Sequence, residues 1–182
     1  MALRFALLDL LAGEPMSGYD LTKVFSLSLA NVWPAQHSQI YPELAKLVRD
    51  GLISQTGDGP RGRKVYSITP EGVDAIRAWL RETQPDYGIR AESILRLFCL
   101  WALPTDEALG HLERDRAEYE RHRDELASQI SSLDWSGNVS QRGARLTIEF
   151  GHRYYIGCIE WIDWAKVQIE AGALQPGGPV PR

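Results

Sequence analysis

The sequence has little cysteine and no long apolar segment. Its only two cysteines, Cys99 and Cys158, are far apart in the chain. Neither lies in a Cys-x-x-Cys spacing or in another metal-ligand spacing, so we expect two reduced, buried thiols and no disulfide framework. No apolar run approaches the roughly 20 residues that a membrane-spanning helix requires. We therefore expect no membrane partner.

Motifs of the common enzyme classes are also missing. There is no nucleophile elbow, phosphate-binding loop or metal-ligand cluster, and the four histidines are scattered. The stretch GDGPRGRK (57–64) superficially resembles a phosphate-binding loop, but it lacks the G-x-x-x-x-G-K-[ST] spacing and lies between two expected strands. We therefore expect a protein that is not an enzyme and that has no cofactor and no bound metal.

The N-terminus and the composition indicate an ordinary globular protein. The first residues are apolar after Arg4, as in a weak signal peptide, but Asp9 interrupts them and no clean cleavage site follows. We interpret this segment as an amphipathic helix of a cytoplasmic protein. With 44% hydrophobic and 24% charged residues, the 182-residue chain is long enough for one domain, or for a small domain with an extension.

The net charge of −4 is unevenly distributed along the chain. Residues 1–84 contain nine Lys or Arg and nine Asp or Glu, whereas residues 85–182 contain eleven and fifteen. The first part is therefore neutral, and its densest positive charge is the run of Arg61, Arg63 and Lys64. Binding to phosphates requires such a local positive patch rather than a positive chain.

Apolar spacing predicts three helices before residue 51. The first covers residues 3–11 and ends near Gly13, and the second begins after Ser17, a candidate N-cap. The third covers residues 36–50 and ends at Gly51, a typical C-cap residue. The expected buried stripe of the third helix consists of Ile40, Leu44, Leu47 and Val48.

A β-hairpin and a fourth helix follow. Leu52–Thr56 and Val65–Ile68 have the pattern of strands, and the turn-forming residues between them predict a hairpin loop. Thr69 is a candidate N-cap for a helix that begins at Pro70 and ends near Arg81. This order of elements is typical of a winged helix-turn-helix. Its third helix enters the major groove of DNA, and its hairpin wing reaches the flanking backbone.

Two groups of side chains are candidate DNA contacts. The basic wing residues neutralise phosphates, and polar residues at the start of the third helix read base edges. Tyr19 and Lys23 lie where the second helix crosses the DNA backbone, although Tyr19 equally suits the core. The candidates are Ser17, Tyr19, Lys23, Gln36, His37, Ser38, Gln39, Tyr41, Lys46, Arg61, Arg63 and Lys64. The alternative is a polar helix surface and a solvated basic loop.

The remainder of the chain has the pattern of long helices. After a linker at 83–89, a short apolar helix precedes a charged helix at 106–133 with apolar residues every seven positions. A last helix covers residues 142–171, and the Pro/Gly-rich tail at 173–182 predicts a flexible segment. The expected fold is mainly α with a small β-hairpin wing. It consists of an N-terminal winged helix-turn-helix (1–84) and a C-terminal antiparallel helical dimerisation domain (85–172).

Three stretches resemble the PadR family of bacterial transcriptional regulators. They are LLDLLAGEPMSGYDL (7–21), VWPAQHSQIYPELAKLVRDGLI (32–53) and GPRGRKVYSITPEG (59–72). The helical part is similar, in pattern and length, to the C-terminal dimerisation domain of the longer PadR subfamily. The resemblance implies a homodimer that represses transcription from inverted-repeat sites and releases DNA on binding a small molecule. It also implies that Tyr41 and the basic wing residues contact DNA.

The last helix supports a homodimer independently of the resemblance. It has two apolar stripes, and a partner copy would cover the stripe that the chain itself leaves open. The expected interface residues are Leu112, Tyr119, Leu126, Phe150, Ile159 and Ile162. Candidates for a pocket that binds a small aromatic effector are Trp101, Tyr154, Tyr155, Trp161 and Trp164. The alternative for these aromatic residues is plain core or dimer interface.

The sequence therefore predicts a homodimeric, ligand-responsive repressor that binds double-stranded DNA. The alternative is a winged-helix adaptor that binds another protein and no DNA, because the fold alone does not exclude it. The basic wing distinguishes the two functions, since an adaptor has no need of Arg61, Arg63 and Lys64 together.

Overall fold

A computed structural model describes residues 2–28, 37–59, 63–86, 88, 91–132 and 136–175. The chain forms two compact units. The first comprises Met1–Pro85 and Ser132–Ile148, and the second comprises Asp86–Ser131 and Glu149–Arg182. Residues 132–148, which we expected in the C-terminal domain, therefore belong to the first unit. One physical reason is that Ser140 is buried there and its hydroxyl donates a hydrogen bond to Asp9.

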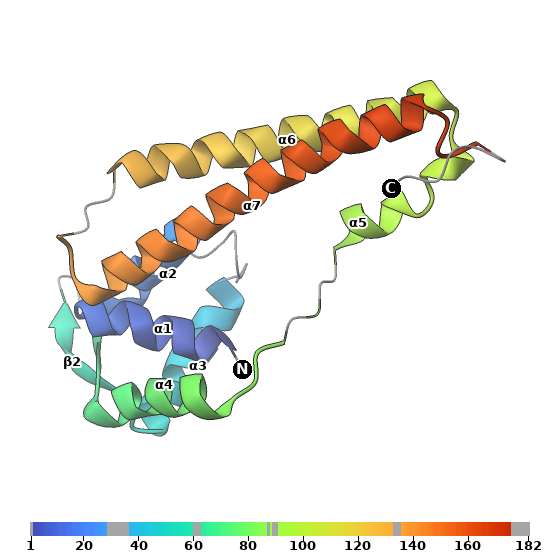
Figure 1. Ribbon diagram of the computed structural model, residues 1–182. Helices are drawn as coiled ribbons and strands as arrows, with labels where there is room; N and C mark the ends of the chain where they lie inside the picture. Colours follow the sequence, from blue (N-terminus) through green and yellow to red (C-terminus); the bar gives the residue numbers. More distant parts are fainter. Residues whose placement is uncertain are drawn as a thin grey trace. The chain divides into compact units, whose positions relative to one another are not determined.

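Three helices, α1 (Ala2–Gly13), α2 (Gly18–Ser28) and α3 (His37–Arg49), open the first unit as predicted (Figure 1). Their apolar faces meet in one core, and each large apolar side chain buried there contributes roughly 1.5–3 kcal/mol. The most deeply buried residues of these helices are Leu7, Leu8, Leu21, Phe25, Ile40, Leu44 and Leu47.

The third helix deviates from the predicted stripe at one position. Ile40, Leu44 and Leu47 are fully buried, but Val48 is exposed, so it does not belong to the core. The helix ends where predicted, because Gly51 adopts a φ of 72°, which is a left-handed conformation that glycine tolerates best. The next amide, that of Leu52, donates to the carbonyl of Leu47 and closes the helix end.

The sheet has three antiparallel strands in the order β1-β3-β2. They are β1 (Met16–Ser17), β2 (Ile53–Gly59) and β3 (Arg63–Ile68). The strands β2 and β3 form the predicted wing hairpin, but both extend further toward the loop than expected. The two-residue strand β1 was not predicted; it pairs Ser17 with Val65 and thereby fixes the start of α2 against the wing.

The fourth helix, α4 (Pro70–Glu82), begins at the predicted cap. The Thr69 hydroxyl accepts a hydrogen bond from the amide of Gly72 at 3.1 Å and donates to the carbonyl of Gly51 at 2.8 Å. This residue therefore connects the end of α3 with the start of α4. The ring of Trp79 stacks on that of Phe5, with 4.5 Å between their centroids, so α4 also packs on α1.

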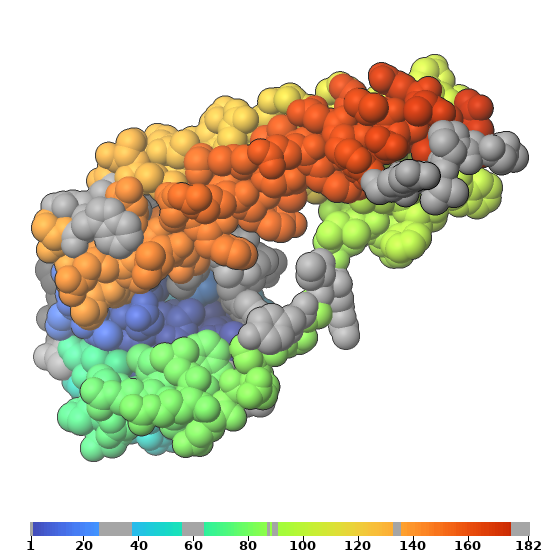
Figure 2. All heavy atoms as spheres, in the orientation of Figure 1, coloured from blue at the N-terminus to red at the C-terminus, as the bar shows by residue number. Residues whose placement is uncertain are grey.

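The second unit consists of α5 (Glu92–Leu97), the short 3-10 helix η1 (Leu100–Ala102), α6 (Thr105–Ser132) and most of α7 (Val139–Glu170). Within this unit, α6 and α7 lie side by side and antiparallel (Figures 1 and 2). Arg116 pairs with Asp163 at 3.1 Å, and Lys166 pairs with Glu113.

Several large apolar side chains of the second unit are exposed. Phe98 and Trp101, between α5 and α6, are 77% and 69% exposed. Cys99 lies between them and is also exposed, so the expectation of two buried thiols is wrong for this residue. Cys158 is partly buried on α7, and burial raises the pKa of its thiol.

Candidate nucleic-acid interface

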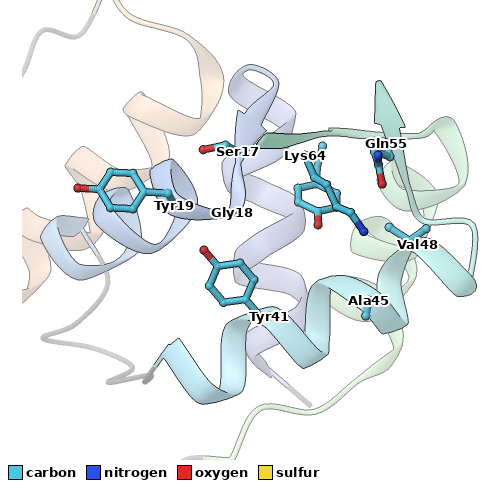
Figure 3. A pocket seen from close by; sticks show the side chains of 9 residues that line it. Ser17, Gly18, Tyr19, Tyr41, Ala45, Val48, Gln55 and Lys64 are labelled. Atoms are coloured by element: carbon cyan, nitrogen blue, oxygen red, sulfur yellow. The ribbon is translucent and has the colours of Figure 1, made fainter. Parts of the chain in front are cut away.

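An open cavity of about 620 Å³ lies on the first unit between the start of α2, the flank of α3 and the wing (Figure 3). Three tyrosines and one lysine are among the residues that line it. Among the described residues that line it, Lys64 is the one charged group and none is a carboxylate. The lining residues are Ser17, Gly18, Tyr19, Tyr41, Ala45, Val48, Gln55, Lys64 and Tyr66.

The start of α2 is held rigidly at one side of this cavity. The Asp20 amide donates to Ser17 Oγ at 3.2 Å, and the Ser17 amide donates back to Asp20 Oδ2 at 3.4 Å; the Ser17 hydroxyl also donates to Asp20 Oδ2 at 2.6 Å. This reciprocal pair is a capping box, which satisfies donors at the helix start. Ser17 is therefore the N-cap that the sequence predicted, and it is buried, so its hydroxyl is engaged within the protein.

The exposed face of α3 presents two different surfaces. Ser38, Pro42, Ala45 and Arg49 lie opposite the buried stripe, as expected for residues at spacings of three and four in a helix. Tyr41 and Val48 lie on the flank that borders the cavity. This flank explains why Val48 is exposed.

The other flank of α3 carries paired charges. Lys46 forms an ion pair with Glu43 at 3.2 Å, and Arg4 of α1 lies 2.7 Å from Asp50 and 3.9 Å from Glu43. Lys46, a predicted DNA contact, therefore already has an acidic neighbour on its own helix. Surface pairs of this kind contribute little to stability, about 0–1 kcal/mol, so Lys46 remains free to exchange partners.

The wing contributes Lys64 and Tyr66 to the cavity. Successive side chains of a strand point to opposite faces, so these two residues share one face of β3. Tyr66 is almost fully buried, and burial raises the pKa of its hydroxyl, with a further increase from the neighbouring Tyr41. The Tyr66 phenol is thus held in its neutral form, in which it donates a hydrogen bond. Lys64 is exposed and provides the positive charge at the rim.

The structure brings four of the predicted DNA contacts together at the cavity: Ser17, Tyr19, Tyr41 and Lys64. Ser38 and Gln39 are exposed on α3, and Lys23 is exposed on α2. Four other predictions cannot be placed. Gln36 and Arg61 lie outside the described residues, as do the side chains of His37 and Arg63.

Several residues of this surface were missed by the sequence-based prediction. Gly18, Ala45 and Gln55 line the cavity, and Arg49 is exposed on the outer face of α3. The helical spacing of Arg49 from Pro42 was a usable signal. Gly18 and Gln55 offered none, because their relevance depends on the packing of α2 against α3 and on the register of the wing.

A second cavity, of about 550 Å³, lies within the helical unit and is lined mainly by apolar groups. Of the five predicted effector-binding residues, Tyr154 and Trp161 line it, whereas Trp101, Tyr155 and Trp164 do not. Tyr155 instead packs between Tyr119 and His122 of α6. The lining residues are Ser93, Ile94, Leu97, Asp115, Tyr119, Arg153, Tyr154, Gly157, Cys158, Trp161 and Ile162.

Polar groups in this second cavity are partly shielded from water. Burial, together with a hydrogen bond to Cys158, raises the pKa of Tyr154 to about 12. Burial also raises the pKa of Tyr119. Both phenols are therefore neutral at physiological pH, and Arg153 and Asp115 supply charges of opposite sign at the cavity lining.

The predicted interface residues divide into two groups. Leu112, Leu126, Ile159 and Ile162 are buried inside a single chain. They form the packing of α6 on α7 rather than a surface for a second copy, which corrects the prediction for these four residues. Tyr119 is half-buried and lines the second cavity, whereas Phe150 is 67% exposed.

The described part of the chain contains neither a cluster of metal ligands nor a membrane-spanning helix. No group of three or more His, Cys, Asp or Glu side chains there is arranged to hold a metal ion. Among the same residues, no helix combines the length and the apolar character needed to cross a membrane.

Two protein-family models match the chain. A family model described as the transcriptional regulator PadR-like family matches residues 7–78, and one described as virulence activator alpha C-term matches residues 89–170. The chain belongs to the PadR-like family of transcriptional regulators. A negative transcriptional regulator PadR of Bacillus subtilis is 37% identical over 110 residues, which cover 58% of this chain and 60% of that protein.

Solved structures of PadR-like proteins share the fold over most of the chain. The crystal structure of Bacillus subtilis PadR in complex with operator DNA has a TM-score of 0.81 at 28% identity, and covers 93% of this chain and 99% of that one. The same protein in complex with p-coumaric acid has a TM-score of 0.79 at 27% identity, with the same coverage. The virulence activator AphA of Vibrio cholerae has a TM-score of 0.72 at 25% identity, and covers 93% and 98%.

These comparisons confirm the family and the fold class expected from the sequence. The PadR-like relatives are regulators rather than enzymes, which agrees with the expected absence of catalysis. The curated sequence match spans three fifths of the relative's length.

Proposed function

We propose that the chain is a sequence-specific DNA-binding transcriptional regulator and acts as a homodimeric repressor. The observation that carries the proposal is the cavity that Tyr19 of α2, Tyr41 of α3 and Lys64 of the wing line together. Phenol hydroxyls and an ammonium group can donate hydrogen bonds, and no carboxylate is among the described residues that line the cavity, which suits the oxygens of a DNA phosphate. The exposed start of α3 then lies in the major groove, where Gln39 and Ser38 reach base edges.

Exposed apolar surface on the described part of α7 supports the proposed dimer. Phe150, Tyr154, Trp161 and Trp164 form one stripe of α7 and are 40–67% exposed, whereas the opposite stripe is buried on α6. Contiguous aromatic surface of this kind marks interaction sites in proteins. A twofold partner covers it and duplicates the DNA-binding surface, so the proposed operator is an inverted repeat.

We further propose that a small aromatic effector releases the operator. The cavity lined by Tyr154 and Trp161 has the size and apolar lining of ordinary ligand sites. A ligand there changes the separation of the two recognition helices, and a shift of a few ångströms prevents both from entering their grooves. Bacillus subtilis PadR, a negative regulator crystallised with p-coumaric acid, is the relative that motivates the choice of repression and of a phenolic compound.

The test is fluorescence anisotropy of the purified protein with a labelled duplex from directly upstream of its own coding sequence. The control is a scrambled duplex of equal length, and both are titrated with salt. We expect tighter binding to the upstream duplex and a logarithmic affinity that falls linearly with the logarithm of salt concentration. Binding that equals the scramble requires selection from random DNA to find a distant operator.

The second candidate function is a winged-helix adaptor that binds a protein and no DNA. Absence of binding to any duplex at low salt would favour the adaptor, because phosphate contacts dominate under those conditions.

Release of DNA by p-coumaric acid, with an altered dimer shape in solution scattering, supports the effector mechanism. If p-coumaric acid releases the DNA while the shape of the dimer stays the same, the effector instead competes directly with DNA for the protein.

A further inference from the structure

Gly18 leaves space that the ring of Tyr41 occupies (Figure 3). A Cβ atom built on Gly18 lies 2.7 Å from Tyr41 Cε1, 3.3 Å from Cζ and 3.4 Å from the hydroxyl oxygen. Real Cβ atoms essentially never approach another atom within 3.0 Å. Any side chain at position 18 therefore excludes the present position of the Tyr41 ring.

The backbone of Gly18 does not itself require glycine. Among the described glycines, a left-handed φ occurs at Gly51 and Gly172, with values of 72° and 91°. Gly18 instead begins a regular helix, α2, where alanine is the better helix former. The need for glycine at this position therefore comes from the space beside Tyr41 and not from backbone conformation.

The main chain on the Gly18 side is fixed, so it cannot retreat from an added methyl group. Ser17 pairs with Val65 of β3 and caps α2 through Asp20. The Thr22 hydroxyl donates to the carbonyl of Gly18 at 2.8 Å, in a buried position. The strand pairing, the helix cap and the hydrogen bond from Thr22 therefore all hold this turn in place.

The main chain on the Tyr41 side is fixed as well. Ile40 and Leu44, which flank Tyr41 on α3, are fully buried in the core. The Tyr41 side chain, in contrast, is 47% exposed and turns about two torsion angles. The Tyr41 ring is therefore the part that moves when position 18 gains a methyl group. Because this movement relieves the clash, we expect the protein to stay folded.

We propose that Gly18 is a positioning residue for DNA binding, because its missing side chain seats the Tyr41 phenol in the cavity beside Tyr19 and Lys64. This inference rests on the proposed function. The seated ring places its hydroxyl at the start of α2, on the same cavity as the Lys64 ammonium. A turned ring takes the hydroxyl away from the phosphate that these groups share, so Gly18 acts through Tyr41 and not by its own contact.

A double-mutant cycle tests the inference in the full-length protein. The variants are Gly18→Ala, Tyr41→Ala and the two combined, measured by anisotropy with the upstream duplex and with the scrambled duplex at low salt. Gly143→Ala is the matched control, because a Cβ there has no atom within 4 Å. Thermal melting followed by circular dichroism reports whether each variant folds.

We expect Gly18→Ala to weaken DNA binding about ten-fold or more at each half-site, as loss of one hydrogen bond to a charged group does. The melting temperature stays near that of wild type. In the Tyr41→Ala background, where no ring remains to be displaced, Gly18→Ala adds little further loss. Gly143→Ala binds like wild type.

An independent readout follows the ring without DNA. The measurement is NMR of protein with carbon-13-labelled tyrosine, in which the Tyr41→Phe variant assigns the Tyr41 ring resonances. We expect these resonances to shift in Gly18→Ala and to keep their positions in Gly143→Ala. Unchanged resonances would overturn the inference, since the methyl group must then fit without moving the ring.

The binding outcomes separate this inference from the proposed function. If the wild-type protein binds the duplex and Gly18→Ala binds it with the same affinity, the positioning role of Gly18 is overturned and the proposed function is not. An equal loss in the presence and absence of the Tyr41 ring also overturns it, because Gly18 then acts directly at the DNA. Wild-type protein that binds no duplex at low salt overturns the proposed function and this inference with it.

Discussion

Replacement of Gly72 by alanine is expected to destabilise the first unit. Gly72 is buried in the first turn of α4, and a Cβ built on it lies 2.2 Å from the carbonyl oxygen of Leu52 and 2.8 Å from Ile68. Unlike an exposed ring, this carbonyl belongs to the main chain at the end of α3. It also accepts a hydrogen bond from the Thr69 amide at 3.1 Å, so it cannot move without loss of that bond.

The magnitude follows from three contributions. Overpacking of a tight site costs about 1–3 kcal/mol, and displacement of the Leu52 carbonyl weakens a hydrogen bond whose net value is about 1 kcal/mol. The better helix propensity of alanine offsets at most about 1 kcal/mol. Because 2.2 Å is a severe approach to backbone, we expect the overpacking cost to lie at the upper end. The predicted net loss for Gly72→Ala is about 2–3 kcal/mol.

Hydrogen exchange followed by mass spectrometry measures this loss separately in each unit. We expect amides of α3 and β3 in Gly72→Ala to exchange about 30- to 150-fold faster than in wild type. Gly143→Ala, with open space around the added methyl group, should keep or increase protection. Equal protection in Gly72→Ala and wild type would refute the reasoning, because the main chain at Leu52 would then yield at little cost.

Three further predictions concern DNA binding and assembly. Lys64→Ala should weaken binding to operator and scrambled duplexes alike and lower the salt slope by about 0.9 for each lysine removed, so about 1.8 in a dimer; an unchanged slope places Lys64 away from phosphate. Gln39→Ala should change the base preference found by selection from random DNA, whereas an equal loss for all sequences assigns it to the backbone. Phe150→Glu, at an exposed position, should shift the protein from dimer to monomer in light scattering without unfolding it; a dimer as stable as wild type would exclude Phe150 from the interface.

Local signals in the sequence were sufficient for most of the first unit. The caps at Ser17 and Thr69 and the stop at Gly51 depend on neighbours in the chain, and all three occur as predicted. The stripe of Ile40, Leu44 and Leu47 also depends on local helical spacing. In contrast, β1 has only two residues, which is too short for any alternation of apolar and polar side chains.

The cavity on the first unit was predicted only in part. Tyr19, Tyr41 and Lys64 were each candidates from the chemistry of their side chains, but no local pattern in the sequence indicated that they line one site. Their convergence depends on strand register and on the packing of α2 against α3. Gly18 was missed for the same reason, since the role of an absent side chain appears only when its neighbour in space is known.

The helical unit shows why periodicity predicts burial better than it predicts partners. Apolar residues at every seventh position, such as Leu112 and Leu126, indicated a face that must be covered, and we expected a second copy to cover it. In the structure α7 of the same chain covers them, and Arg116 pairs with Asp163 across the two helices. A seven-residue repeat is the same whether the partner helix is in the same chain or in another.

The aromatic stripe of α7 indicates which face of the helical unit remains available to a second copy. Once α6 has covered Ile159 and Ile162, the aromatic stripe that includes Phe150 and Trp164 stays exposed. Its burial against a second copy at roughly 25 cal/mol per Å² provides a driving force that the chain alone does not use. The face to which the sequence analysis assigned most of the interface is therefore the core of the unit, and the aromatic stripe is the surface on which the proposed dimer depends.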